Sequence, residues 1–444
     1  MKVTKLPFNP GPAAWNSILP PDSGHPELNS HEITDWLIIG AGFAGLSAAR
    51  RIQLERPSDR ITILDAKRLA EGPAGRNSGF MIDLPHDLAS KDYGGSLHED
   101  KNKIEQNRLA INFAKKAVYD LRIPKEAFQE VGKVNAAATT TGIKHNLNYK
   151  SHLTNLKENC ELYDTKQMKE LTGTRYYLGG LFTPGTVMLQ PALYIRELGK
   201  KLISAKLKIY ENSPVISLLH KGPDWQAETP KGSITTQKII MATNGHAENF
   251  GLYKRRLIHL FTYGSMTQVL TAEESKILGG KAHWGLTSAD PLGTTVRKIS
   301  TISGDRIMIR NSVTYEPKMQ PTVAALKRIY AKHTTSFYSR FPNLKDVRMA
   351  FNWGGQLAFS INNVPAFGET EKGLFTACCQ NGLGTVNGTL QGIAAADYAM
   401  GVNSKLVDAL CMEDPPKKLL PEPITRVGAN LRIRFGEFKA GAEL

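Results

Sequence analysis

Cysteine is scarce in this sequence. Only four cysteines occur among 444 residues, and no two of them form a C-x-x-C pair: Cys160, Cys378, Cys379 and Cys411. This scarcity argues against a disulfide framework, a zinc ribbon and a dithiol redox centre of the kind found in pyridine-nucleotide disulfide reductases. We therefore expect reduced, structural cysteines and no metal site.

Long hydrophobic runs are also missing. Hydrophobic residues make up 41% of the chain and charged residues 22%, but no apolar run approaches the roughly 18 residues that a membrane span needs. The first thirty residues contain six prolines and lack the continuous apolar core of a signal peptide. We predict an N-terminal arm over residues 1–31, no transmembrane segment and a cytoplasmic location.

Basic clusters with interleaved aromatic residues are missing as well. The formal net charge of +15 is compatible with a nucleic acid, an anionic membrane face or an acidic substrate. The densest basic clusters, at 254–256, 417–418 and 432–434, have none of the aromatic interleaving typical of RNA-binding segments. We expect a solvated basic surface and no nucleic-acid partner, and steering of an anionic partner stays open as a second interpretation.

A glycine-rich turn between two apolar segments is the first positive signal. Residues 35–65 predict a strand, a tight turn, a helix and a second strand. Gly40 permits the sharp turn, Gly42 lets the backbone approach a pyrophosphate, and Gly45 lets the helix pack on the strand. Asp65 follows twenty residues after Gly45, where a carboxylate accepts hydrogen bonds from ribose hydroxyls. The neighbouring members of the predicted cofactor-binding set are Phe43, Ala44 and Ala66.

Such a turn also occurs without a ligand, but its context favours dinucleotide binding. Two further glycine-rich turns then favour FAD over NAD. One has Arg76, Asn77 and Ser78 between two glycines, and the other spans residues 379–389 ahead of an alanine-rich helical stretch. An extended FAD needs backbone contacts along its length, whereas no second G-x-G-x-x-G unit exists for a separate nicotinamide cofactor. The residues of the last turn expected to hold FAD are Asn381, Gly382, Leu383, Gly384 and Thr385.

The order of these segments resembles the D-amino-acid oxidase-like family of flavoproteins, especially the branch that contains gamma-glutamylputrescine oxidase, glycine oxidase and sarcosine oxidase. The similarity covers most of the chain and is carried by residues 40–45, 75–79, 180–191, 208–215, 239–245, 353–355 and 381–384. It implies an α/β fold, with an FAD-binding Rossmann-like doubly wound domain and a substrate domain built on a mixed or antiparallel sheet. It also implies that the backbone at Val215 contacts the adenine.

By this resemblance the FAD-binding domain is discontinuous. The expected segments are 32–85, 166–250 and 355–400 for the FAD-binding domain, 86–165 and 251–354 for the substrate domain, and 401–444 for a C-terminal tail. Residues 86–165 look mainly helical. Strands are predicted from apolar and β-branched patterns at 257–270, 293–300 and 305–315. We expect these strands to form a mixed sheet that covers the flavin.

The resemblance implies that a hydride equivalent leaves the carbon next to a neutral amine nitrogen, with flavin N5 as the acceptor, and that the imine then hydrolyses. The protein must hold the carbon, keep the amine deprotonated and exclude water, so an obligatory catalytic base need not exist. The expected partners are a small amine or amino acid and either oxygen or another electron acceptor.

Few side chains stand out as catalytic candidates. The four chosen are His86, Tyr263, Arg310 and Trp353, with Asn352 beside the last and with His246 and His259 as weaker candidates. Each has a structural alternative. The histidine can bond a loop carbonyl, the aromatic rings can fill the core, and the arginine can form a surface ion pair.

An arginine expected of amino-acid oxidases is missing. In glycine oxidase-like members an arginine that clamps the substrate carboxylate follows closely on the Trp-x-Gly segment, but residues 356–360 contain none. Nothing neutral reproduces the bidentate pairing of a guanidinium with a carboxylate. We therefore predict an amine substrate with no strict need for an α-carboxylate, as in the gamma-glutamylputrescine oxidase branch. Arg310 stays open as a replacement clamp.

Two other functions fit the sequence. One is a flavin dehydrogenase that passes electrons to a quinone or a carrier protein. The other is a nucleotide-binding protein without redox turnover, against which the full set of FAD motifs speaks. The sequence gives no indication of the oligomeric state.

Overall fold

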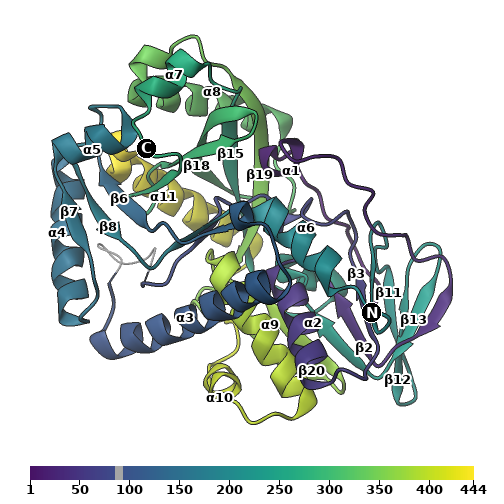
Figure 1. Ribbon diagram of the computed structural model, residues 1–444. Coiled ribbons are helices and arrows are strands. Elements are labelled where there is room, and N and C mark those ends of the chain that lie inside the picture. The colour runs from purple at the N-terminus through teal and green to yellow at the C-terminus, as the bar shows by residue number, and fades with distance from the viewer. Residues whose placement is uncertain (86–93) are drawn as a thin grey trace.

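The computed structural model describes residues 1–85 and 94–444. A six-stranded sheet lies in the part of the molecule that contains the βαβ unit (Figure 1). Five of its strands are parallel and neighbours in the order β10 (Leu207–Tyr210), β3 (Ile61–Leu64), β2 (Trp36–Ile39), β14 (Lys238–Met241) and β21 (Leu374–Cys378). The sixth strand, β20 (Ala366–Glu371), is antiparallel at the edge.

Both faces of this sheet are buried. This explains why its central strands, β2, β3 and β14, consist mainly of apolar residues such as Ile and Leu. Alternate residues point to opposite faces. Ile38 and Ile63 pack on the face covered by helices, whereas Leu37 and Ile39 pack on the other. The helices on or near the first face are α2 (Phe43–Glu55), α3 (Leu97–Asp120), α6 (Pro191–Leu202) and α9 (Gly384–Met400).

The second face is covered by a four-stranded sheet, not by helices. Its order is β1 (His31–Ile33), β13 (Ser233–Thr236), β12 (Asp224–Glu228) and β11 (Ser217–Lys221). Strands β11 to β13 form an antiparallel meander, and β1 pairs with β13 in parallel. Trp225 and Leu218 of this meander fill the layer against the central sheet.

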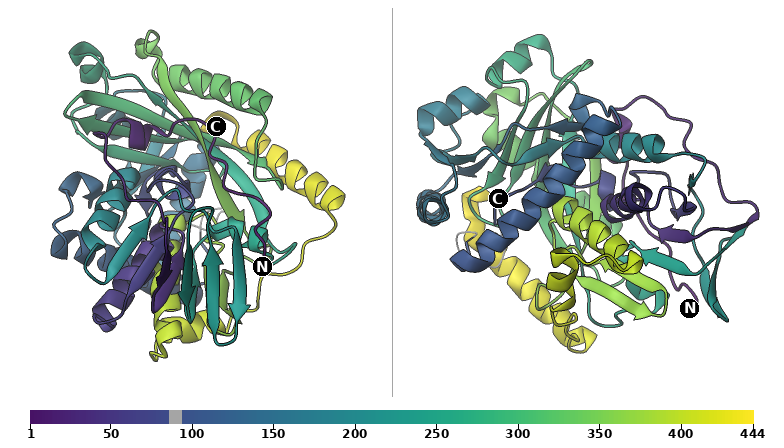
Figure 2. Two further views of the ribbon diagram at one scale, coloured as in Figure 1. Left: turned by 90° about the vertical axis from the view of Figure 1, so that its right-hand side faces the viewer. Right: turned by 60° about the horizontal axis from the view of Figure 1, so that its bottom comes forward.

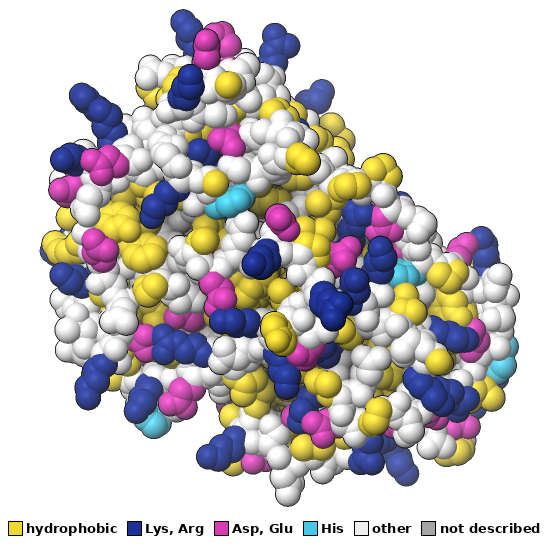
Figure 3. All heavy atoms as spheres, in the orientation of Figure 1, with side chains coloured by type: hydrophobic (Ala, Val, Ile, Leu, Met, Phe, Trp, Pro, Cys, Tyr) yellow, Lys and Arg dark blue, Asp and Glu magenta, His cyan; other side chains and the backbone are white. Residues whose placement is uncertain are grey.

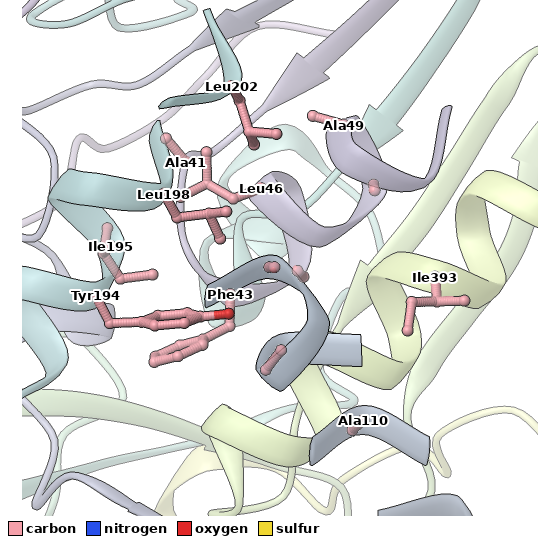
Figure 4. Packing of buried hydrophobic residues seen from close by; sticks show 14 of the residues in the cluster. Ala41, Phe43, Leu46, Ala49, Ala110, Tyr194, Ile195, Leu198, Leu202 and Ile393 are labelled. Carbon is pink, nitrogen blue, oxygen red and sulfur yellow. The ribbon is translucent and has the colours of Figure 1, made fainter. Parts of the chain in front are cut away.

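Helices α2, α6 and α9 pack closely where they meet. Figure 4 shows Phe43, at the start of α2, stacked on Tyr194 of α6, with ring centroids 5.8 Å apart. A Cβ added at Gly392 of α9 would collide with the carbonyl of Ala44. The absence of side chains at such positions lets α2 and α9 lie side by side, so their N-termini are held in a fixed relation.

A second, eight-stranded sheet forms the upper part of the molecule in Figure 1. Its order is β19 (Met349–Phe359), β15 (Ile258–Thr267), β18 (Gly304–Tyr315), β17 (Thr295–Thr301), β16 (Trp284–Ser288), β6 (Lys133–Ala137), β8 (Gly179–Thr183) and β7 (Glu161–Tyr163). Its pairs are antiparallel except for β16 with β6. Helices α8 (Val323–Arg340) and α11 (Glu422–Ala440) contact β18 of this sheet (Figure 2).

The remaining elements are short or peripheral. They include a three-stranded sheet in the order β4 (Phe80–Met81), β9 (Val187–Leu189) and β5 (Phe128–Gln129). The other α-helices are α1 (Ala14–Ser17), α4 (Thr140–Asn155), α5 (Thr165–Thr172), α7 (Ala272–Ile277) and α10 (Lys405–Cys411). No helix in residues 1–85 or 94–444 is long and apolar enough to cross a membrane.

The predicted fold class is confirmed. The molecule combines a parallel α/β sheet that starts from the βαβ unit with a mixed sheet of long strands. The strands expected at 257–270, 293–300 and 305–315 correspond to β15, β17 and β18. The division of the chain into domains stays a prediction, and β8, at 179–183, pairs within the eight-stranded sheet.

Candidate active site

One long cavity begins at the glycine turn after β2. Gly40 has a φ of +104°, and a Cβ there would lie 2.6 Å from the carbonyl oxygen of Ala242. A Cβ on Gly45 would collide with the carbonyl oxygen of Gly40. Both positions therefore require glycine, Gly40 for its positive φ and its closeness to Ala242, and Gly45 for its closeness to Gly40. Gly42 differs, because its only close neighbour is the Ala74 methyl group at 3.5 Å, so the space in front of it is open.

Two helices begin at this cavity without a side-chain cap. Gly42 precedes α2, Leu383 precedes α9, and neither N-terminus has a side-chain acceptor for its first amides. Elsewhere, Ser96, Thr139 and Thr322 cap α3, α4 and α8 through side-chain oxygens. The uncapped N–H groups and the dipoles of α2 and α9 therefore favour an anionic ligand in the cavity.

Asp65 lies at the carboxyl end of β3 on the wall of the cavity. Its Oδ2 accepts a hydrogen bond from the amide of Ala41 at 2.8 Å, and its Oδ1 accepts one from the amide of Lys67 at 2.9 Å. Burial raises the pKa of Asp65 to about 6 in spite of these two bonds. The carboxylate is thus oriented by the backbone of the glycine turn, and it titrates in a range close to neutral pH.

Hydrogen bonds within the loop after β3 fix its conformation. The Asn77 amide group donates to the carbonyl of Ala74 at 2.7 Å and accepts from the amide of Gly79 at 2.8 Å. Arg76 points away from the cavity and donates to the carbonyls of Pro10 and Gly354 at 3.0 and 3.2 Å. Burial lowers the pKa of Arg76 to about 10. Its role in the structure is to join this loop to the N-terminal arm and to β19.

Arg297 holds the same loop from the eight-stranded sheet. Its guanidinium donates to the carbonyls of Ser78, Gly79 and Leu189 at 2.9, 3.2 and 2.8 Å. It also lies over the ring of Trp15, 5.0 Å from the centroid. Burial lowers the pKa of Arg297 to about 9. Arg297 thus places a buried guanidinium beside this loop, where three carbonyl groups and the ring of Trp15 hold it.

Thirteen of the sixteen predicted cofactor-binding residues line the cavity: Gly40, Gly42, Phe43, Ala44, Asp65, Ala66, Asn77, Ser78, Val215, Gly382, Leu383, Gly384 and Thr385. The other three, Gly45, Arg76 and Asn381, do not. Asn381 instead accepts a hydrogen bond from the amide of Ser360 at 2.9 Å. Individual contacts of these residues with a cofactor stay predictions.

The N-terminal arm closes one side of the cavity. Val3, Lys5, Leu6, Pro7 and Asn9 contribute to its wall. The arm is tied to the body by backbone hydrogen bonds, from Val3 to Ile216 at 2.9 Å and from Thr4 to Asn249 at 3.0 Å. The arm expected from the prolines is therefore ordered and forms part of the site.

The eight-stranded sheet contributes the wall at the other end. Arg310 of β18 lies opposite Thr295 of β17 in the strand register, and both line the cavity with Asp290 and Thr287. This end therefore combines a guanidinium, a carboxylate and hydroxyl groups. Lys133 lies behind it and donates to the hydroxyl of Thr287 at 3.2 Å.

Lys133 is a buried amine next to this wall. Burial lowers its pKa to about 8. Asn135 contacts both the Lys133 ammonium and the Thr287 hydroxyl, the latter at 2.7 Å. Within residues 1–85 and 94–444, the side chain of Lys133 is thus linked to the cavity through the Thr287 hydroxyl group that lines it.

Tyr263 and Trp353 lie in the core between the described elements and do not line the cavity. The Tyr263 hydroxyl is 2.7 Å from that of Thr314, and the Trp353 indole donates to the carbonyl of Arg76 at 3.0 Å. The polar atom of each side chain is hydrogen-bonded, as expected if these residues fill the core and have no catalytic role. Trp353 also supports the loop from behind.

The remaining catalytic candidates lie in different places, and only some of them line the cavity. His86 lies outside the described residues. Asn352 accepts a hydrogen bond from Ser265 at 2.7 Å and is not in the cavity wall. His246 lines the cavity, and burial lowers its pKa to about 4, so its imidazole is neutral near pH 7. His259 lies behind it, 2.7 Å from a carboxylate oxygen of Glu248.

Sequence reasoning missed several residues of the site. Arg297, Lys133 and Asp290 lie within strands or loops that carry no glycine motif. The residues of the arm that form the wall likewise lack a local signal. A lone basic residue in a strand, such as Lys133 of β6, is the one indication that the sequence offers, because charged side chains are rarely buried without a specific reason.

Comparison with known proteins agrees with this arrangement. A model of the family described as FAD dependent oxidoreductase matches residues 35–398. The chain is 24% identical over 397 residues to the probable oxidoreductase OrdL of Haemophilus influenzae, with 87% of each chain covered. It is 24% identical over 445 residues to the gamma-glutamylputrescine oxidoreductase of Escherichia coli, with 92% of this chain and 95% of that protein covered.

The fold has known counterparts as well. Glycine oxidase from Geobacillus kaustophilus superimposes with a TM-score of 0.70 at 14% sequence identity, over 88% of this chain and 100% of that one. The family match extends over most of the chain and includes the glycine turn, the loop after β3 and the start of α9. The chain belongs to the FAD dependent oxidoreductase family.

Proposed function

We propose that this enzyme oxidises a C–N bond of a small amine or amino acid, with FAD as its cofactor. The observation that carries the proposal is a single cavity that runs from the uncapped N-termini of α2 and α9 to a wall with both a guanidinium and a carboxylate. The similarity to a gamma-glutamylputrescine oxidoreductase supports the choice of a C–N bond. The similarity in fold to a glycine oxidase is in keeping with it.

The residues of the cavity fit FAD. The open space at Gly42 and the two helix N-termini suit the pyrophosphate. Asp65, oriented by two backbone amides, suits the ribose hydroxyls. A negative charge at Asp65 would repel a 2′-phosphate, so the site favours FAD over a phosphorylated dinucleotide. When bound, FAD supplies the electron-accepting chemistry.

Substrate binding is assigned to the far wall. Arg310 would hold an anionic group of the substrate, and Asp290 would orient an amino group. Gln356, which lines the cavity, follows the Trp-Gly-Gly segment where an arginine clamp is missing. We therefore propose an amine whose reacting carbon needs no α-carboxylate, with Arg310 recognising a more distant anionic group.

The protein's own contribution is orientation and the exclusion of water. The N-terminal arm and the strands β16 to β18 enclose the cavity from two sides. The hydroxyl groups of Thr287 and Thr295 would position the substrate amine as a neutral species through hydrogen bonds. Holding the reacting carbon in one place replaces the need for a strong catalytic base.

The test is anaerobic bleaching of the flavin absorbance by three sets of compounds: primary amines, polyamine derivatives with a distal carboxylate, and small α-amino acids. The proposal predicts the fastest bleaching by the second set. In Arg310→Ala, the apparent affinity for these compounds should fall by about tenfold or more, because a charge-assisted pair is worth roughly 1.5–3 kcal/mol. The matched control, Arg328→Ala on the exposed face of α8, should behave as wild type.

Two results would overturn parts of the proposal. Rapid reduction only by α-amino acids, lost in Arg310→Ala, would make Arg310 an α-carboxylate clamp. Bleaching by hydroxy acids and by none of the amines would remove the C–N assignment itself. Reoxidation of the reduced enzyme by oxygen, compared with a soluble quinone, identifies the second substrate.

A further inference from the structure

The outer face of α11 carries a continuous apolar stripe. Its members are spaced three, four, four and three residues apart: Ile424 (56% exposed), Val427 (60%), Leu431 (62%), Phe435 (69%) and Phe438 (85%). With 3.6 residues per turn, this spacing places all five side chains on one side of the helix. The helix contacts β18, and its half-buried or buried residues, among them Ala429, Gly436 and Ala440, lie on the other side.

A row of this kind is unusual on the surface of a folded protein. Single exposed hydrophobic residues need no explanation, but a contiguous apolar patch marks a binding surface. In both views of Figure 2, α11 (yellow) runs along the outside of the molecule. The stripe therefore faces away from the eight-stranded sheet, with nothing in the described chain to cover it.

Basic side chains flank the stripe on both sides. By helical geometry, Arg432 and Lys439 lie along one flank and Arg434 along the other. The two acidic residues of α11 are engaged elsewhere, because Glu422 accepts a hydrogen bond from Tyr315 at 2.8 Å and Glu437 pairs with Lys332 at 3.5 Å. The charge that accompanies the apolar stripe is therefore positive.

The neighbouring surface extends this positive charge. Helix α8, joined to α11 by the Lys332–Glu437 pair, has exposed basic residues at Lys327, Arg328 and Lys332 and no acidic residue. Lys417 and Lys418, just before α11, are also exposed. By contrast, the face in Figure 3 has its lysine and arginine side chains scattered among acidic ones. The apolar stripe and exposed basic residues therefore occur together on α8 and α11, where Glu422 and Glu437 are paired with Arg426 and Lys332.

A second copy of the chain is a poor match for this surface. Two stripes crossing near Leu431 would bring Arg432 and Arg434 of both copies together, and the chain has a net charge of +15. A helix of 19 residues is about 28 Å long and 10 Å wide. Its outer face thus offers a footprint of roughly 300 Å², short of the about 800 Å² per partner of a stable protein interface.

An anionic lipid surface matches both features. Helices that lie in the membrane interface place large apolar side chains in the boundary between headgroups and acyl chains, while flanking arginines and lysines meet lipid phosphates. We propose that α11 docks this enzyme on anionic phospholipid bilayers, with the stripe inserted and α8 and 417–418 adding electrostatic attraction. Docking of this kind is peripheral and needs no spanning helix.

The experiment is flotation of the full-length, FAD-containing protein with two kinds of vesicle: phosphatidylcholine alone, and phosphatidylcholine with phosphatidylglycerol. The wild type should float with the anionic vesicles, with less binding to the neutral ones and less at high salt. The double variants Leu431→Glu/Phe435→Glu and Arg432→Glu/Arg434→Glu should each bind the anionic vesicles at least about tenfold more weakly.

The controls separate docking from folding and from catalysis. Leu54→Glu and Arg56→Glu change an exposed apolar and an exposed basic residue at the end of α2, and they should leave vesicle binding unchanged. Flavin absorbance and melting temperature should match wild type in all variants. Vesicle binding is measured without turnover, so its outcome is independent of the substrate assignment.

Absence of wild-type binding to anionic vesicles would overturn the proposal. Equal binding by the Leu431→Glu/Phe435→Glu protein would do the same. A concentration-dependent dimer in sedimentation, abolished by that double substitution and not accompanied by vesicle binding, would assign the stripe to a second copy of the chain.

Discussion

Asp65 is a buried carboxylate on the wall of the cavity, and we propose that it contacts the ribose of FAD. The glycine turn supplies the amides that orient it, and burial raises its pKa to about 6. In the proposed contact, ribose hydroxyls would donate to the ionised form, so the apoprotein would have to lose a proton at Asp65 to bind FAD fully. Acidification therefore opposes binding.

The first prediction is a pH dependence of FAD affinity. Affinity should be constant above about pH 7 and fall by up to about tenfold per pH unit below the pKa of Asp65. Fluorescence titration of the apoprotein with FAD measures it. In Asp65→Asn the affinity should be lower and this part of the profile flat. An unchanged slope in that variant would assign the titration to another group.

Gly42 gives a second prediction at the same scale. Its backbone conformation is ordinary and only Ala74 is close, so Gly42→Glu should leave the apoprotein folded. The new carboxylate would occupy the space in front of α2, where an anion is expected, and should abolish FAD retention. Flavin content after purification is the measurement, with Gly280→Glu in an exposed loop as the control. Full occupancy in Gly42→Glu would remove the pyrophosphate from this turn.

Among the elements, the N-terminal arm forms one wall of the cavity. It is held to β11 and to residue Asn249 by backbone bonds, and Leu6 and Phe8 are both exposed on it. Only Leu6 lines the cavity. These two side chains therefore make a matched pair for testing the arm.

The third prediction compares Leu6→Ser with Phe8→Ser. Loss of the leucine should speed the dissociation of FAD by up to about tenfold, since the burial of such a side chain against a ligand is worth roughly 1–2 kcal/mol. Phe8→Ser should leave the rate near that of wild type. Dissociation is followed by the recovery of flavin fluorescence after dilution. Equal rates in the two variants would argue that the arm does not cover FAD.

The elements differ in how far the sequence predicts them. The positive φ of Gly40 and the contact of Gly45 with the carbonyl of Gly40 arise within the βαβ unit, so the turn and its helix were predictable from local pattern. The contact of the predicted arm with the cavity was not, because Val3 is held there by a hydrogen bond to Ile216, more than two hundred residues away. Such long-range packing leaves no periodic trace in the arm itself.

Strand register limits prediction in the eight-stranded sheet. Tyr263 and Arg310 both occupy predicted strands, but only Arg310 faces the cavity. The pairing of β15 with β18 shifts between Thr262 and Tyr263, and a shift of one residue exchanges the two faces of a strand. Sequence alternation alone therefore could not decide which of the two side chains reaches the cavity.

In the molecule as a whole, Glu443 connects several elements of the eight-stranded sheet that forms the far wall of the cavity. The carboxylate of Glu443 is buried and accepts hydrogen bonds from the amides of Ala138 and Thr139 at 2.8 and 3.0 Å and from the hydroxyl of Ser288 at 2.9 Å. Arg340 of α8 donates to the carbonyl of Glu443 at 2.9 Å. The segment after α11 thus joins β6, β16 and α8.

The fourth prediction concerns this junction. Glu443→Ala should reduce the free energy of unfolding by about 3 kcal/mol, because several buried donors lose their partner at once. Glu437→Ala, which removes a partly exposed ion pair with Lys332, should cost less than about 1 kcal/mol. Urea unfolding followed by circular dichroism gives both values. Similar losses in the two variants would contradict a structural role for the C-terminus.

A single-turnover experiment tests whether this molecule uses FAD to oxidise a C–N bond. Purified enzyme is mixed anaerobically with an excess of the best amine found by bleaching, and the flavin absorbance and the products are measured together. We expect full bleaching, with one equivalent of carbonyl product and one of the released nitrogen compound per FAD, as hydrolysis of an imine requires. Bleaching without a nitrogen product, or a purified protein that carries no flavin, would contradict it.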